Sequence, residues 1–544
     1  MRKYTYIILS LILVLALFSK KRFDLTSDHR YTLAGTTHHI LTSVQNPLHI
    51  TVYLKGDFPS YFKKLQYETA ALLEQFRALN SRITYTFVNP LEKKGLADKL
   101  KKEGMIPAEI SVQQKDRLQT IPVFPWAEIS YDNKKIHFPL LVNTGGIPVE
   151  EQINRSIERL EYAFTYNIHK LTRKQKPAIA ILKGNGELED IYIADFLRTL
   201  HDFYRLAPFT LDSVATNPSG TLEELKKFDL VIIAKPQKAF THAEKFTLDQ
   251  YLMHGGTMML LIDPVKANKD TLMFHHRTYA LNAELNLTDW LFAYGVRPEP
   301  VLVKDLQAAP VAIEVGKVGK NPQLENFPWF YAPLVQPNPH HPVGKNTGKV
   351  KLDFVSLLDT LPRGPRKTVL LESSPYTQVI GVPVQINFEE IAKKPDVNAY
   401  HAGKKIFGIL LEGIFKSAYA NRVKPFKTDV KDSARTKMIL IADGDIIKND
   451  VIKGRPLPLG LDKWSRMQFD NKNFLLNAVN YLTDKNGLFL LNNKVIHMAL
   501  IDKNKAVAEG TFWRRINMFV PVLLILIPLL FFRYKRMKKY SHPL

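Results

Sequence analysis

Cysteine is absent from this 544-residue chain. Its absence excludes disulfides, thiolate metal sites, thiol nucleophiles and anchoring through an acylated N-terminal cysteine. Glycine and proline, at 26 and 33 residues, are too few for a low-complexity linker protein, whereas hydrophobic residues make up 45% of the chain. A chain of this length and composition predicts two or three folded domains.

Familiar catalytic motifs are also missing from the sequence. It contains no G-x-S-x-G elbow, no H-E-x-x-H helix, no Walker A loop and no G-x-G-x-x-G turn after a strand. An amidotransferase-type sheet would need a nucleophile at a strand end, and the usual cysteine is not there. We therefore expect no catalytic residues, no cofactor and no enzymatic activity.

Three histidine pairs, His38–His39, His275–His276 and His340–His341, suggest a metal site at first sight. Adjacent side chains on a helix or strand point apart, so such a pair seldom chelates one ion by itself. We expect surface-loop histidines and no metal site.

The chain is strongly basic, with 75 lysines and arginines against 52 acidic residues and a formal charge of +23. Such a charge often indicates nucleic-acid binding, but here the basic residues are spread along the whole chain. The densest run directly follows an apolar segment, as the positive-inside rule and anionic lipid require. We expect a membrane partner and no nucleic acid, with orientation set by Arg533, Lys535, Arg536, Lys538 and Lys539.

Two uncharged apolar segments lie near the ends of the chain. The first, Tyr4–Phe18, has basic flanks and no small-x-small cleavage site, so residues 1–22 are expected to be an uncleaved signal anchor, although cleavage is not settled by the sequence. The second, Ile516–Phe532, is expected to be a transmembrane helix between a linker at 501–515 and a basic cytoplasmic tail at 533–544. Two spans then predict a two-pass inner-membrane protein with a periplasmic body.

Residues 23–172 have the pattern of an N-terminal α/β domain. Apolar positions alternate with periods of two and of three to four residues, which distinguishes strands from helices. The expected elements are a strand at Leu48–Leu54, a helix at Tyr61–Leu79, a strand at Ile83–Val88, a helix at Leu91–Glu103, paired strands within Ile110–Val142 and a helix at Glu150–Leu171. This order predicts a βαβ unit within a thioredoxin-like layer that lacks the redox cysteines.

Residues 177–500 predict a second α/β domain. The runs Ala178–Leu182, Leu230–Ala234 and Met258–Ile262 are continuously apolar and alternate with amphipathic helices. Continuous apolar strands are typical of a sheet covered on both faces. The pattern favours a doubly wound parallel sheet of Rossmann-like or amidotransferase-like type.

The stretch from about 270 to 365 is polar and rich in proline, so it is expected to be an insertion or a long loop in this domain. Strand-like runs then return. The runs expected to rejoin the sheet are Val369–Glu372, Phe407–Glu412 and Met438–Ala442, with Asn473–Leu482 as a closing helix.

Ligands of doubly wound folds bind at the carboxyl ends of the strands. If one sheet holds these strands, a rim suited to a sugar or a cation is expected to consist of Gly184, Asn185, Gly186, Glu187, Asp263, Asp443 and Asp445. The simpler interpretation, which we favour, is that these residue types are ordinary components of strand-to-helix turns.

Several longer motifs carry a family resemblance. They are Arg22–Leu33, Tyr53–Phe62, Leu410–Arg422, Met438–Val451 and Asn471–Leu482. Over nearly its whole length the chain resembles the GldG family, the gliding-motility-associated ABC transporter component of Bacteroidetes.

The resemblance implies an auxiliary, substrate-binding-like subunit that works with a separate ATPase and a separate permease. It also implies a middle domain similar to one in an intraflagellar-transport protein and related to carbohydrate-binding α/β folds. No catalytic residues are implied. One alternative is a periplasmic glycan-binding module that holds envelope polysaccharide at the rim; the weakest is an unrecognised hydrolase. The transported substrate, the oligomeric state and the choice between motility and export stay open.

Overall fold

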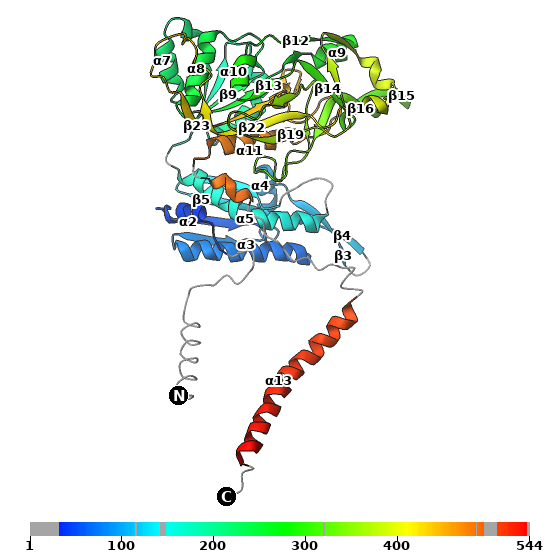
Figure 1. The fold of residues 1–544 in the computed structure, drawn as a ribbon. Helices are drawn as coiled ribbons and strands as arrows, with labels where there is room; N and C mark the ends of the chain where they lie inside the picture. The colour runs from blue at the N-terminus through cyan, green and yellow to red at the C-terminus, as the bar shows by residue number, and fades with distance from the viewer. Residues whose placement is uncertain are drawn as a thin grey trace. The chain divides into compact units, whose positions relative to one another are not determined.

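A computed structural model describes residues 32–114, 117–141, 148–173, 175–318, 321–485, 487–493 and 509–540 (Figure 1). The chain divides into a large unit that contains His29–Lys494 and a small unit that contains Val495–Leu544. The first apolar segment, Tyr4–Phe18, lies outside the described residues.

The first part of the large unit is built on a four-stranded sheet in the order β2-β1-β5-β6. Its strands are β1 (Leu48–Val52), β2 (Ile83–Phe87), β5 (Trp126–Tyr131) and β6 (Lys134–Pro139). β1 and β2 are parallel, and the other two pairs are antiparallel. The βαβ unit expected from Leu48 to Val88 is therefore present, with α3 (Ser60–Leu79) as its helix.

Helix α5 (Val149–Thr172) packs with α3 on this sheet through aromatic side chains. The ring of Phe164 lies 6.4 Å from that of Phe76 in α3 and 5.1 Å from that of Phe138 in β6. Both contacts are edge-to-face, which aromatic quadrupoles favour.

The paired strands expected within Ile110–Val142 form two hairpins and not one. Only β5 and β6 join the sheet, because β3 (Ala108–Gln114) and β4 (Arg117–Val123) pair with each other alone. The expected helix at Leu91–Glu103 is shorter, as α4 (Leu96–Lys102), and α2 (Gly35–Thr42) precedes the sheet. The likeness to a thioredoxin layer stays a prediction.

The second part of the large unit is built on a seven-stranded sheet in the order β19-β22-β23-β10-β9-β7-β8. Its strands are β7 (Ala178–Lys183), β8 (Arg205–Thr210), β9 (Leu230–Ala234), β10 (Thr257–Leu261), β19 (Arg366–Glu372), β22 (Ile406–Lys416) and β23 (Ser433–Ile441). All three runs expected to rejoin the sheet do so.

The expectation of a wholly parallel sheet is wrong at one side. Strands β8, β7, β9, β10 and β23 are parallel, but β22 and β19 run antiparallel. The physical reason lies in the connections, since a parallel neighbour needs a crossover element and β22 turns back into β23 without a helix. The sheet is therefore mixed.

Both faces of this sheet are covered, as its continuous apolar strands indicate. Alternate residues of the fully buried strand β9 enter two separate hydrophobic clusters, Ile232 in one and Val231 in the other. The first face is packed by α6 (Asp190–His201) and α11 (Asn471–Thr483), and the second by α7 (Pro218–Leu225), α8 (His242–Met253) and α10 (Thr288–Ala293).

The stretch from about 270 to 365 is not a long loop. It is an insertion between β10 and β19 with regular elements, namely α9 (Lys269–His275), β12 (Arg277–Asn282), α10, β13 (Val296–Pro298), β14 (Val301–Asp305), β15 (Ala308–Val318), β16 (Asn321–Val335), β17 (Val350–Lys351) and β18 (Leu358–Thr360).

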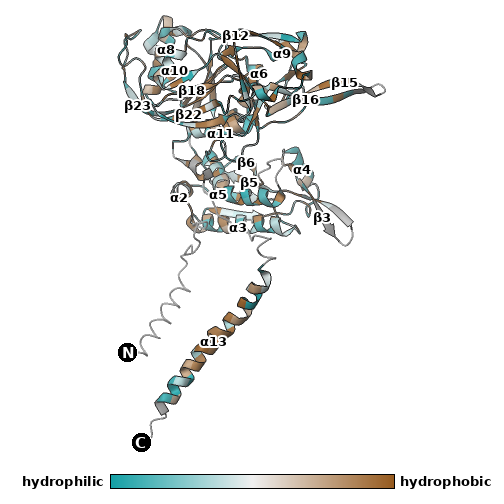
Figure 2. Cartoon of the chain, turned by 45° about the vertical axis from the view of Figure 1, so that its right-hand side comes forward, coloured by the Kyte–Doolittle hydropathy of each residue, from teal (hydrophilic) through white to brown (hydrophobic). Residues whose placement is uncertain are grey.

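The long loop was predicted because this stretch is rich in proline. The β15–β16 hairpin, visible as a long ribbon in Figure 2, tolerates Pro310 and Pro328 facing each other because a ribbon of few strands leaves backbone N–H groups without a ladder partner. Trp329 and Tyr331 at its base are buried in a core of their own. A polar, proline-rich sequence therefore still forms strands here.

The small unit contains helix α13 (Gly510–Tyr540), with Pro521 and Pro528 inside it. Residues Gly510–Lys538 form a helix that is long and apolar enough to cross a membrane, and its most apolar stretch is not buried in protein. Figure 2 shows this helix as a hydrophobic rod with a hydrophilic end. The expected span Ile516–Phe532 lies within it, and the helix indicates association with a membrane.

Candidate functional site

The carboxyl edge of the seven-stranded sheet brings three of the predicted aspartates together. Asp263 follows β10, Asp443 and Asp445 follow β23 on one side of it, and Lys235 follows β9 on the other side. The Lys235 Nζ lies 3.0 Å from Asp263 Oδ2 and 2.5 Å from Asp445 Oδ2. The Gly444 N–H donates to Asp263, and the Asp445 N–H donates to Asp443. These carboxylates are held by a lysine and by backbone amides.

The turn after β7, which contains Gly184 to Glu187, is fastened to the turn after β9. The Asn185 carbonyl accepts the N–H groups of Gln237 and Lys238, both at 2.8 Å. Glu187 Oε2 accepts the Asn185 N–H at 2.9 Å, and burial raises the pKa of Glu187. These bonds agree with ordinary turn chemistry.

Two side-chain oxygens of this turn differ from the others in their hydrogen bonding. Asn185 Oδ1 and Glu187 Oε1 are buried, and neither has a hydrogen-bond partner within the described part of the chain. The ligand-binding role of the predicted residues stays a prediction. These two oxygens are the hydrogen-bond acceptors of the turn that a ligand could use.

A second set of charges at this edge was missed by sequence reasoning. Lys351 Nζ lies 2.6 Å from Asp353 Oδ2 and 2.7 Å from Asp462 Oδ2, and Lys269 Nζ lies 2.9 Å from the same Asp462 oxygen. Lys269, Lys351 and Asp353 belong to the stretch expected to be a loop. No sequence signal links Asp462 to the two lysines, because it lies 111 positions from Lys351 and 193 from Lys269.

Opposite charges set the ionisation of this network. Burial alone would lower the pKa of Lys235, but the carboxylates of Asp263 and Asp445 outweigh burial and raise it. Burial alone would raise the pKa of Asp462, but Lys351 and Lys269 hold it well below its usual range. Asp443 has no such lysine, so burial and the neighbouring carboxylates of Asp445 and Asp263 raise its pKa well above the usual range.

The cavity left at the carboxyl edge is small. It has a volume of about 70 Å³ and is lined by Lys235, Lys351, Asp353, Asp445 and Asp462 among others. Pockets for organic ligands usually measure roughly 300–1,000 Å³. The space therefore suits ordered water or a small ion, and the network fixes the insertion to the sheet.

The histidine pairs lie mostly at the surface, as expected, but not all in loops. His38 and His39 are exposed on helix α2, and His340 is exposed beside the half-buried His341. Burial lowers the pKa of His341 to about 4. Across the described residues, no group of three His, Asp or Glu side chains is arranged to hold a metal ion.

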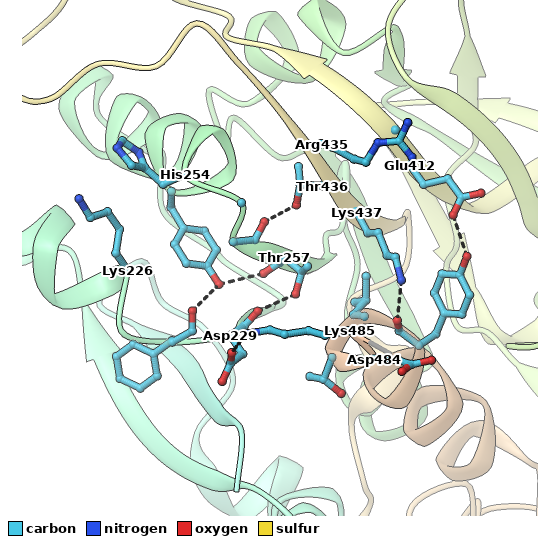
Figure 3. A pocket seen from close by; sticks show the side chains of 18 of the residues that line it. Lys226, Asp229, His254, Thr257, Glu412, Arg435, Thr436, Lys437, Asp484 and Lys485 are labelled. Carbon is cyan, nitrogen blue, oxygen red and sulfur yellow. Dashed lines mark hydrogen bonds and ion pairs between the residues drawn. The ribbon is translucent and has the colours of Figure 1, made fainter. Parts of the chain in front are cut away.

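A larger cavity of about 890 Å³ opens at the opposite, amino edge of the same sheet (Figure 3). Its walls come from Asp229 before β9, Thr257 at the start of β10, residues 435–437 of β23, residues 412–413 of β22 and the end of α11. No sequence motif marks it, because each wall contributes only one to a few residues.

Two ion pairs cross the walls of this amino-edge cavity. Lys485 Nζ lies 2.6 Å from Asp229 Oδ1, and Arg366 forms an ion pair with Glu412. Glu412 also accepts the Tyr481 hydroxyl at 2.7 Å. Two cations, Arg435 and Lys437, stand beside these pairs without joining them (Figure 3).

Comparisons with known proteins cover both parts of the large unit. A family described as an ABC-type uncharacterized transport system matches residues 176–478, and a domain of unknown function matches residues 27–130. A protein of Borreliella burgdorferi, described only as uncharacterized, is 19% identical over 448 residues, which are 80% of this chain and 79% of that protein.

Among solved structures, the mmIFT52 N-terminal domain is similar to part of the chain. It is 12% identical and covers 56% of this chain and 97% of its own, with a TM-score of 0.32.

Proposed function

Because this chain belongs to the ABC-type uncharacterized transport system family, we propose that it is a membrane-bound auxiliary subunit of an ABC transporter. It works with a separate ATPase and a separate permease, and it catalyses no reaction of its own. The family match carries this proposal, since it spans most of the seven-stranded sheet and its insertion.

Membrane attachment is supported by helix α13. Its apolar side chains, such as Leu524 and Phe532, are 67% and 71% exposed, an arrangement that is unfavourable in water and favourable in lipid. The basic residues Arg533 to Lys538 follow the apolar part, and by the positive-inside rule they support a cytoplasmic tail. With Tyr4–Phe18 as a second span, the large unit is periplasmic.

A non-catalytic role is supported by the carboxyl edge of the sheet, where doubly wound folds usually hold their substrates. Asp263 and Asp445 are bound to Lys235, and Asp462 is bound to Lys269 and Lys351. Carboxylates engaged in this way are poorly placed to act as bases or nucleophiles. Nucleotide hydrolysis is then carried out by the separate ATPase subunit.

The finer assignment to gliding motility is supported by the motifs shared with the GldG family, such as Met438–Val451. That motif forms the end of β23 and the turn with Asp443 and Asp445. We propose an organisation with an N-terminal domain at 23–172 and a sheet domain at 177–500 between the two spans.

Co-purification tests the proposal. The tagged full chain is extracted from its native membrane in mild detergent, and the accompanying proteins are quantified by mass spectrometry. An ATPase and a permease subunit are expected at near-equal molar yield. A matched chain that ends at residue 508 lacks α13 and is expected to lose both. Recovery of neither subunit with the full chain contradicts the proposal.

A second candidate is a glycan-binding module at the carboxyl edge. The buried, unpartnered oxygens Asn185 Oδ1 and Glu187 Oε1 favour it, and the volume of about 70 Å³ beside Lys235 weighs against it. Substitution of Glu187 and Asp443 by Gln and Asn is then expected to abolish retention on envelope polysaccharide without unfolding the protein. Unchanged retention rules this site out.

A further inference from the structure

The amino-edge cavity has the dimensions of a ligand site. Its volume of about 890 Å³ falls in the range of roughly 300–1,000 Å³ that is usual for organic ligands. Aromatic rings of Phe228, Tyr251 and Tyr481 line it together with charged groups. A mixed apolar and charged lining is typical of sites that bury a ligand and orient it through a few polar groups.

The acidic groups of the lining are already occupied. Asp229 binds Lys485, and Asp229 Oδ2 also accepts the Ala178 N–H at 2.9 Å. Glu412 binds Arg366 and the Tyr481 hydroxyl, and Asp484 accepts the Phe489 N–H at 2.7 Å. Asp229 and Glu412 are therefore each paired with a cation already, whereas Asp484 also acts electrostatically on Lys437.

Two cations of strand β23 have no carboxylate partner. The side chain of Arg435 makes no hydrogen bond or ion pair with any residue that the structure describes. Lys437 Nζ donates only to the Tyr481 carbonyl, at 3.2 Å, and lies 4.4 Å from the centre of the Tyr481 ring. Residues two apart on a strand share one face, so these two charges act side by side.

Their alignment is fixed by the residue between them. The Thr436 hydroxyl donates to the carbonyl of Gly256, the residue that precedes β10. This bond and the ladder to β22, where Lys437 pairs with Glu412, hold the backbone of β23 in place. The two cations therefore stand on a rigid element, which binding sites require for precise geometry.

The charge of Lys437 is only partly compensated. The side chain is half-buried, and burial lowers its pKa more than the nearby Asp484 carboxylate raises it, because the charged form is poorly solvated. An anion in the cavity would compensate the Lys437 ammonium for the hydration that it loses on burial. Arg435 beside it offers the planar fork that binds phosphate or carboxylate with two parallel hydrogen bonds.

We propose that the amino-edge cavity binds an organic anion, with its phosphate or carboxylate groups held by Arg435 and Lys437 and its body packed on Tyr481. This site lies at the edge of the sheet opposite to the one where such folds usually bind ligands. The inference does not depend on the transporter partnership, because it rests on the cavity alone.

Calorimetric titration of the detergent-purified full chain tests it with two probes, tripolyphosphate and trigalacturonate. One saturable site is expected, with weaker binding when salt rises from about 50 to about 300 mM, since salt screens the charges. A preference for tripolyphosphate indicates a phosphate-bearing ligand, and a preference for trigalacturonate indicates a carboxylate-bearing one. Either preference supports the site, and binding of neither probe at millimolar concentration overturns it.

Variants locate the binding. The double variant Arg435→Ala/Lys437→Met is expected to weaken affinity at least tenfold, and Arg435→Ala alone, at an exposed position that tolerates substitution, at least threefold. The control Lys101→Ala/Lys102→Ala removes the same charge from the exposed end of α4 and is expected to stay within twofold of wild type. Wild-type affinity in the cavity variants, or an equal loss in the control, overturns the proposal.

Discussion

The two edges of the seven-stranded sheet are both rich in charge, but they use it differently. At the carboxyl edge, Lys235, Lys269 and Lys351 each contact two carboxylates, and a cavity of only about 70 Å³ remains. At the amino edge, Arg435 and Lys437 form no ion pair with a carboxylate of the described residues, and they stand beside about 890 Å³ of open space.

This difference separates charges that hold the fold from charges that are available to a ligand. A buried lysine between two aspartates contributes to the structure, and removal of one partner leaves an uncompensated charge. Substitution of a cation at an open cavity by a neutral side chain costs little folding stability. Its presence there is therefore better explained by the binding of a ligand. The following predictions test that division in order of decreasing effect.

The largest effect is expected at Asp462. Its side chain is 2% exposed and accepts from both Lys269 and Lys351. Asp462→Asn leaves two largely buried lysines short of a partner, so it is expected to lower the free energy of unfolding by about 3–5 kcal/mol. Urea denaturation followed by tryptophan fluorescence measures the loss.

A matched control for this variant is Asp429→Asn. Asp429 is 77% exposed, and its side chain lies 3.5 Å from His254. It is expected to change stability by less than about 0.5 kcal/mol. A loss below about 1 kcal/mol for Asp462→Asn would mean that the carboxyl-edge network does not hold the fold.

The next effect concerns close packing at the carboxyl edge. A Cβ on Gly444 would lie 2.7 Å from Lys235 Cβ and Cγ, so Gly444→Ala displaces Lys235 from its two aspartates. A loss of about 1–3 kcal/mol is expected. Gly381→Ala is the control, because nothing lies within 4 Å of its added methyl. Equal melting curves for the two variants would contradict the assigned role of Lys235.

A pH-dependent effect is expected at Asp443, whose pKa is raised in the folded protein by burial and by the neighbouring Asp445 and Asp263. A raised carboxyl pKa gives stability that is complete below the unfolded pKa and is lost as pH rises through the folded pKa. The stability advantage of wild type over Asp443→Asn should therefore be larger at about pH 5 than at about pH 8. An advantage that grows with pH would contradict this assignment.

The smallest effect is expected at Lys437. Because it lacks a carboxylate partner, Lys437→Met should change the free energy of unfolding by less than about 0.5 kcal/mol at neutral pH. Burial lowers the pKa of Lys437 in the folded protein. The free energy of unfolding of wild type should therefore rise relative to that of the variant as pH rises from the pKa in the folded state toward the pKa in the unfolded state. A loss of about 2 kcal/mol or more would give Lys437 a role in the fold like that of Lys235.

Regular apolar patterns predicted much of this fold. The strand Leu230–Ala234 has the predicted bounds, because burial on both faces gives a continuous apolar run. Helix α3 begins one residue before its predicted start, because burial on one face gives apolar residues a helical period. The antiparallel direction of β22 was not predictable in this way, since a strand pattern carries no direction.

Polar contacts between distant residues were the hardest to predict. The strand ends placed Asp263, Asp443 and Asp445 at one edge, but the neighbouring ion pair of Lys351 and Asp462 comes from short segments without a period. The amino-edge cavity was missed for a related reason, because its two cations look like ordinary surface residues of a strand until α11 packs beside them.

Hydrogen–deuterium exchange of the full chain, with and without tripolyphosphate, tests most directly which edge of the sheet receives a ligand. The account predicts slower amide exchange at residues 433–437 and 481–485 and unchanged exchange at residues 443–462. Protection at 443–462 without protection at 433–437 would contradict it.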